Sequence, residues 1–223
     1  MSTNGLRCVF LAAGLALPVH AVEISADMPA ELRRSLTEAL FFLEAIQGGA
    51  AIESPLHREL FGEIRGADYI AFIDSNVREI IPGECDAPPK GCKVLARTYG
   101  PDQIQVTPSF SRVDVARRAA VLLHEARHFS LPDHGGHVAC PTPFLDEEGR
   151  DIVNVLTREP LAGLDVCDAG ANGSYGLEYV FLTNFARGCS NCSKEIKSKA
   201  RFWAEQAFYR INDEEARTAL RQD

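Results

Sequence analysis

Downstream of residue 21, the sequence lacks any apolar run long enough to span a bilayer, and it has no internal repeat or low-complexity segment. It is also short of positive charge, since 23 Lys and Arg stand against 31 Asp and Glu, a net charge of −8. We therefore expect no nucleic-acid partner. With 46% hydrophobic and 24% charged residues, the composition excludes disorder, collagen and coiled-coil arrays. A G-x-S-x-G motif, a glycine-rich phosphate loop and a calcium loop are also missing.

The first 21 residues have the features of an export signal. Arg7 is their only charged residue, and an apolar run from Val9 to Leu17 follows it. The segment ends in Pro18-Val19-His20-Ala21, with small residues where a signal peptidase cleaves. We expect residues 1–21 to be removed as a signal peptide and residues 22–223 to form a single domain. The mature protein would then be periplasmic or extracellular, without membrane insertion.

Cysteine usage agrees with export. Cys8 lies in the predicted signal, which leaves an even set of six: Cys85, Cys92, Cys140, Cys167, Cys189 and Cys192. An even count in an exported chain indicates disulfides, and six cysteines allow 15 pairings. Spacing favours three short loops, Cys85–Cys92, Cys140–Cys167 and Cys189–Cys192. A redox or zinc role for the last pair, a C-x-x-C motif, has less support because no second C-x-x-C accompanies it.

Apolar periodicity and turn residues predict one α+β domain that is mostly helical with a small sheet. Helices are expected over residues 28–47, 54–61, 111–129, 148–157, 175–187 and 194–211. Strands are expected over 69–73, 93–99 and 103–107, and loops over 82–92 and 130–147. The third helix begins with Ser111 and Asp114, and the apolar run at 119–123 indicates burial on nearly all sides.

That buried helix contains an H-E-x-x-H motif, His124-Glu125-Ala126-Arg127-His128. Residues four apart lie on one helix face, so both imidazoles can share one tetrahedral metal ion, for which zinc is suited. Glu125 projects beside them, where it can hold and deprotonate a water. Buried polar groups must be paired, and two further histidines follow directly, so a metal site is favoured over a chance match.

The residues from Val121 to His137 resemble the active-site region of the zincin metallopeptidases. The resemblance is specific in the motif and covers a small part of the chain. It implies a zincin-like fold, zinc bound by His124 and His128, and Glu125 as the general base.

Three residues are candidates for the third metal ligand. His134 has the spacing of the metzincin motif H-E-x-x-H-x-x-G-x-x-H, but Leu131 replaces the glycine and both methionines lie upstream, so a methionine turn is absent. His137 follows two glycines, which allow a return turn, and precedes Cys140. Glu178 shares a helical stripe with apolar residues; it is either a ligand, as in gluzincins, or part of a buried ion pair.

Weaker signals surround these candidates. Tyr175 and Tyr179 are either core residues or donors to an oxyanion. Asp165 and Asp168 lie on either side of Cys167; they are either turn residues, or one of them is an acceptor for a ligand histidine. His57 has no catalytic Ser or Cys motif beside it and is expected at the surface.

The sequence therefore predicts a secreted zinc metalloendopeptidase that hydrolyses peptide or protein substrates by metal-activated water, with Glu125 as general base. The alternative is a non-catalytic zinc-binding or protein-interaction module on a zincin-like scaffold. Four protein ligands would favour the module, whereas three protein ligands and a water would favour the enzyme.

Overall fold

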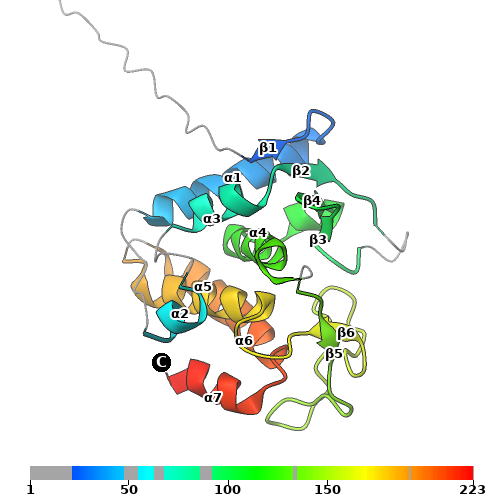
Figure 1. Cartoon of the computed structure of the whole chain (residues 1–223), viewed down its shortest axis with the longest axis vertical. Coiled ribbons are helices and arrows are strands. Elements are labelled where there is room, and N and C mark those ends of the chain that lie inside the picture. The colour runs from blue at the N-terminus through cyan, green and yellow to red at the C-terminus, as the bar shows by residue number, and fades with distance from the viewer. Residues whose placement is uncertain are drawn as a thin grey trace, which may run out of the picture.

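Figure 1 presents a computed structural model of the chain, which describes residues 22–47, 55–62, 68–85, 92–132, 135–190 and 192–222. The predicted signal segment, residues 1–21, and the candidate ligand His134 lie outside these ranges. Within them, no helix is both long and apolar enough to cross a membrane.

Helices form most of the regular structure in the described ranges. The α-helices are α1 (Ala30–Gln47), α2 (Pro55–Leu60), α3 (Tyr69–Asn76), α4 (Val115–Ser130), α5 (Ser174–Gly188), α6 (Lys194–Tyr209) and α7 (Glu214–Gln222). The strands are β1 (Glu23–Ile24), β2 (Glu79–Pro82), β3 (Ala96–Tyr99), β4 (Gln103–Val106), β5 (Val138–Ala139) and β6 (Asp165–Cys167). The predicted fold class, mostly helical α+β with a small sheet, is confirmed.

The main sheet has four strands in the order β1-β2-β4-β3. β1, β2 and β4 run parallel to one another, and β3 is antiparallel to β4. The expected Gly100-Pro101-Asp102 turn joins β3 to β4, and Gly100 adopts the left-handed φ of 60° that favours glycine. β3 therefore forms one edge of the sheet.

α4 lies at the centre of the molecule, between α1, α3 and the main sheet on one side and α5 and α6 on the other (Figure 1). A 3₁₀ helix at Pro108–Arg112 precedes it, so α4 begins at Val115 rather than at residue 111 as predicted. The Asp114 carboxylate accepts a hydrogen bond from the Arg117 backbone N–H at 3.1 Å and caps the helix. Residues 118–128 are all buried, as the apolar run predicted, so the polar motif residues lie inside the protein.

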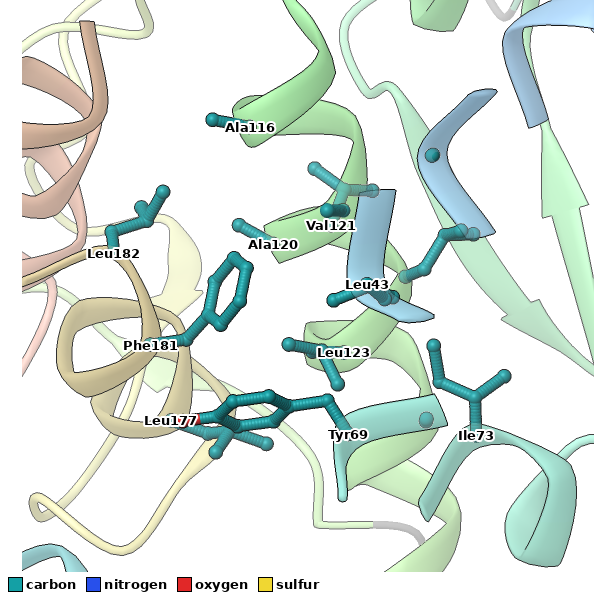
Figure 2. Packing of buried hydrophobic residues seen from close by; sticks show 14 of the residues in the cluster. Leu43, Tyr69, Ile73, Ala116, Ala120, Val121, Leu123, Leu177, Phe181 and Leu182 are labelled. Atoms are coloured by element: carbon teal, nitrogen blue, oxygen red, sulfur yellow. The ribbon is translucent and has the colours of Figure 1, made fainter. Parts of the chain in front are cut away.

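Small residues on α4 let α5 pack closely against it. Ala116 and Ala120 face Phe181 and Leu182 of α5 (Figure 2). Tyr69 of α3 meets Phe181 edge-on, with ring centroids 5.0 Å apart. Burial of each such large side chain stabilises the fold by about 2 kcal/mol. This core fixes the H-E-x-x-H motif relative to α5.

Residues 69–73, predicted as a strand, form the first part of α3 instead. Tyr69, Ile70, Phe72 and Ile73 are buried, whereas Ala71 is half-buried. This spacing is helical, and a five-residue apolar run cannot be distinguished from a buried strand by periodicity.

Residues 148–157, predicted as a helix, form turns and isolated bridges. The Asp146 carboxylate accepts hydrogen bonds from the backbone N–H groups of Glu148 and Arg150, at 3.0 and 2.8 Å. Gly149 between them has a left-handed φ of 76°. The aspartate and glycine together favour a tight turn over a helix start.

His57 is buried, with 1% of its surface exposed, and the expected surface position is wrong. Its Nδ1 lies 3.3 Å from Nδ2 of Asn184 on α5, and the rings of Phe61 and Tyr69 lie beside it. The imidazole therefore joins α2 to the core.

Three disulfides pair Cys85 with Cys92, Cys140 with Cys167 and Cys189 with Cys192, the pairs that spacing favoured. The Cys140–Cys167 bond connects the ends of β5 and β6, which pair as a second, two-stranded sheet. Around this disulfide lies a small apolar cluster with Phe144, Ile152 and Leu161, separate from the main core.

Candidate metal centre

Three histidine side chains converge on one point. His124 and His128 lie one turn apart on α4, and His137 directly precedes β5. The Nε2 atom of His124 is 3.2 Å from Nε2 of His128 and 3.3 Å from Nε2 of His137. Among the described residues, these three form the group that could hold a metal ion.

The opposite ring nitrogen of each histidine faces an oxygen atom. Nδ1 of His128 donates to the Gly135 carbonyl at 2.7 Å, and Nδ1 of His137 donates to Asp168 Oδ1 at 3.0 Å. Nδ1 of His124 lies 3.3 Å from Oε2 of Glu178. A proton on each Nδ1 leaves each Nε2 as an acceptor, and three acceptors in contact fit a shared cation.

The surroundings also keep His124 neutral. Burial is the main cause that holds its pKa well below the ordinary 6.5, and the charges of His128 and His137 lower it further. A neutral imidazole is the form that coordinates a metal.

A glycine turn carries the chain from the end of α4 back to the histidines. The Gly135 N–H donates to the Pro132 carbonyl at 3.0 Å, and Gly135 has a left-handed φ of 44°. A Cβ at this position would lie 2.4 Å from Leu131 Cδ1, so the turn requires glycine. The return turn expected before His137 is present, and its carbonyl orients His128.

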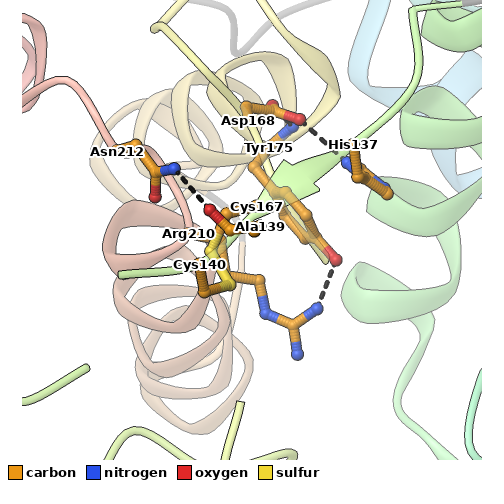
Figure 3. The surroundings of a disulfide bond; sticks show 8 residues. All are labelled: His137, Ala139, Cys140, Cys167, Asp168, Tyr175, Arg210 and Asn212. Carbon is orange, nitrogen blue, oxygen red and sulfur yellow. Dashed lines mark hydrogen bonds and ion pairs between the residues drawn. A yellow bond between two sulfur atoms is a disulfide. The ribbon is translucent and has the colours of Figure 1, made fainter. Parts of the chain in front are cut away.

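Asp168 connects His137 to α5. One carboxylate oxygen accepts from His137, and the other accepts from the backbone N–H of Tyr175 at 2.6 Å, in the first turn of α5 (Figure 3). Gly173 precedes this helix without a side-chain cap, and a Cβ there would lie 2.3 Å from Asp168 Oδ2. Asp168 therefore serves as the histidine acceptor, and the neighbouring Cys140–Cys167 disulfide anchors it.

Glu178 faces the far side of His124 from the point where the Nε2 atoms meet. It is 1% exposed and forms an ion pair with Arg117, the alternative that the sequence left open. Burial lowers the pKa of Arg117 to about 10, which still leaves the guanidinium charged at neutral pH. The geometry gives Glu178 the task of orienting His124.

Glu125 lies in the same pocket as the histidines. Its carboxyl is buried, and burial raises its pKa to about 8, against the lowering effects of a hydrogen bond from the Thr98 backbone and of the Arg117 charge. The pocket has a volume of about 340 Å³, and residues 93–98 form part of its lining. A carboxyl with a pKa near neutrality can take up and release a proton there.

Tyr175 forms one wall of the pocket. Its ring centroid lies 4.5 Å from that of His124, and it stacks on His137 at 5.0 Å. Its hydroxyl accepts a hydrogen bond from Arg210. The hydroxyl of Tyr179, by contrast, donates to the Leu220 carbonyl at 3.4 Å, so Tyr179 belongs to the core.

Three arginines line the pocket, Arg97, Arg117 and Arg210, and none of them was predicted from the sequence. Arg117 lies on the α4 stripe that also carries Val121, His124 and His128, so its helical spacing from the motif could have revealed it. Arg210, at the end of α6, has no such signal because its place depends on how α6 packs against α5.

A comparison of the chain with protein-family models, with curated proteins and with solved structures found no match in any of the three.

Proposed function

We propose that this protein is an exported zinc-dependent metallopeptidase. One observation carries the proposal: three Nε2 atoms converge while each Nδ1 faces a carbonyl or carboxylate oxygen. Such outer acceptors fix ring orientation and raise the basicity of metal-binding histidines. A set of two buried imidazoles and one partly buried imidazole beside a carboxylate suits a catalytic metal better than a core histidine pair.

Zinc is the ion that best fits these donors. Imidazole nitrogens suit zinc, and calcium or magnesium would require oxygen ligands. Among the described residues, no fourth His, Cys, Asp or Glu joins the three histidines. Catalytic zinc sites keep one of four positions open, so a three-ligand set favours catalysis over a structural site.

The pocket suits an extended peptide. β3 is an edge strand, and residues 93–98 line the pocket beside Glu125. Unpaired backbone groups on a strand edge can bind the main chain of a peptide as an added strand. This supports peptide or protein substrates over small molecules.

In this proposal, each group at the site has a separate role in hydrolysis. His124, His128 and His137 would hold the zinc ion, which would supply Lewis acidity to polarise a carbonyl and to lower the pKa of water toward 7. Glu125 accepts a proton from water and passes it to the leaving amine. Asp168 and the Gly135 carbonyl accept from Nδ1 of His137 and His128 and keep these two imidazoles in the ligating tautomer, while Glu178 lies 3.3 Å from Nδ1 of His124.

We also propose that the protein is exported, on the basis of its disulfides and its predicted signal segment. Three disulfides form and persist in oxidising compartments, and they are rare in the cytosol. Together with the predicted signal at residues 1–21, they support a periplasmic or extracellular location.

The test separates the base from the ligands. Glu125→Gln preserves size and helix position and should retain about one zinc per chain, because Glu125 is not among the three converging ligands. It should lose hydrolysis of an unfolded protein substrate by a factor on the order of a hundred or more. His124→Ala, the comparison variant, should lose zinc and hydrolysis together. Equal hydrolysis by the wild type and Glu125→Gln would refute the mechanism.

A further inference from the structure

The pocket beside the histidines contains more positive than negative side chains. Its carboxylates are Glu125 and Glu178, and its cationic side chains are Lys93, Arg97, Arg117 and Arg210. This contrasts with the acidic chain as a whole, whose net charge is −8. A local excess of positive charge in an acidic protein points to an anionic ligand.

Three of the four cationic side chains form an ion pair or a hydrogen bond with an acidic or amide side chain. Lys93 forms an ion pair with Glu159 at 3.2 Å, and Arg97 donates to Gln105 at 2.7 Å. Arg117, as described above, pairs with the buried carboxylate of Glu178.

Arg210 differs from these three in its partner, which is the side chain of Tyr175, and none of the described carboxylates forms an ion pair with it. Its guanidinium donates to the Tyr175 hydroxyl, and its Cζ lies 4.9 Å from the centroid of the Tyr175 ring. A guanidinium held by stacking is already oriented and offers its remaining donors to a carboxylate.

The position of Arg210 indicates which part of a substrate it meets. Tyr175 lies between His137 and Arg210 (Figure 3). The guanidinium is thus separated from the converging histidines by a tyrosine ring. That offset suits a group next to the reacting carbonyl better than the carbonyl oxygen itself.

We propose that Arg210 binds a carboxylate of the substrate, so that the pocket selects peptides with an acidic group, either a side chain or the C-terminus, beside the scissile bond. This inference rests on the proposed peptidase function. Tyr175 is a positioning residue, because it holds the guanidinium by stacking and by its hydroxyl.

Matched peptides test the selection. A set of peptides is prepared in pairs that differ only by Glu or Gln, by Asp or Asn, or by a C-terminal carboxylate or carboxamide. The zinc-loaded wild type should cleave the acidic member of at least one kind of pair with a kcat/KM about tenfold higher or more. Arg210→Gln should bring this ratio close to one, and Arg210→Lys should retain part of it. Arg201→Gln, an exposed arginine on the same helix, should leave the ratio unchanged.

Binding provides a second readout that needs no turnover. Trp203 is the only tryptophan in the chain, and it lines the same pocket. In zinc-loaded Glu125→Gln, the acidic peptide should change Trp203 fluorescence and bind about tenfold more tightly than its amide partner. The added Arg210→Gln change should abolish that difference while the zinc content stays the same.

Each outcome then decides one of the two proposals. Cleavage without any acid preference, a preference that survives in Arg210→Gln, or an equal loss of kcat for both peptides with KM unchanged would overturn the role of Arg210. Charge-dependent binding without cleavage of any peptide would refute the peptidase while the carboxylate site stands.

Discussion

His137 and His134 are three residues apart and serve as a matched pair at the residue scale. His137 directs Nε2 toward His124, whereas His134 lies outside the described residues. We predict that His137→Ala lowers zinc affinity by a factor on the order of a hundred or more, because a ligand is lost and Asp168 keeps no imidazole partner. His134→Ala should change the affinity by less than about threefold. Competition with a chromogenic chelator measures both, and the reverse ranking would assign the third ligand to His134.

The sequence could identify those site residues that lie close together along the chain, but not those that tertiary packing brings together. His124 and His128 are four residues apart on one helix, so helical spacing alone predicts that they share a face, with Glu125 beside them. His137 remained one of three candidates because its position depends on the turn at Gly135 and on Asp168, 31 positions along the chain. The partner of Glu178 could not be predicted, since ion pairing across α4 and α5 is set by tertiary packing.

At the element scale, the Cys140–Cys167 disulfide anchors both the segment that follows His137 and the strand that precedes Asp168. We predict that Cys140→Ala/Cys167→Ala lowers zinc affinity about tenfold or more, because the unlinked strands hold His137 and its acceptor less firmly. Cys189→Ala/Cys192→Ala removes a bridge from the C-terminal end of α5 and should leave the affinity nearly unchanged. The same chelator competition compares them, and an equal loss in both would mean that the effect is general destabilisation.

Element length decided which helices and strands the sequence could reveal. The long periodic helices α1, α5 and α6 were predicted within a few residues of their observed ends. α7 was missed because only two of its apolar residues, Ala216 and Leu220, pack inward, whereas Ala219 is exposed. The four-residue strand β2 was missed as well, since it is too short to display an alternation. Short elements acquire their structure from neighbours rather than from their own pattern.

At the scale of the whole molecule, the burial of Glu125 makes stability depend on pH when no metal is bound. Its pKa is about 8 in the folded protein and 4.5 in its ordinary state, so the folded form holds the proton more tightly. The resulting stability is complete below pH 4.5, declines as the pH rises toward 8 and is then lost. Glu125→Gln does not titrate.

We therefore predict that metal-free Glu125→Gln becomes progressively more stable than the metal-free wild type between about pH 4.5 and 8. The difference in unfolding free energy should reach a few kcal/mol, at about 1.4 kcal/mol for each unit of pKa shift. Urea unfolding in the presence of a chelator, at pH 5 and pH 8, measures it. All other titrating groups are common to both proteins, so parallel stability profiles would contradict the raised pKa.

Asp168 couples His137 to the first turn of α5, because its two carboxylate oxygens accept one hydrogen bond from each. One carboxylate serves His137 and the first turn of α5, so a displacement at either oxygen is felt at the other. Capture of an ion and ordering of that turn are thus thermodynamically coupled, and the coupling free energy is the same in both directions. Because α5 packs on α4, which carries the other two histidines, the contacts close into a ring. Binding of an ion at the candidate centre would therefore change how rigidly the first turn of α5 is held, although α5 contributes none of the three imidazoles.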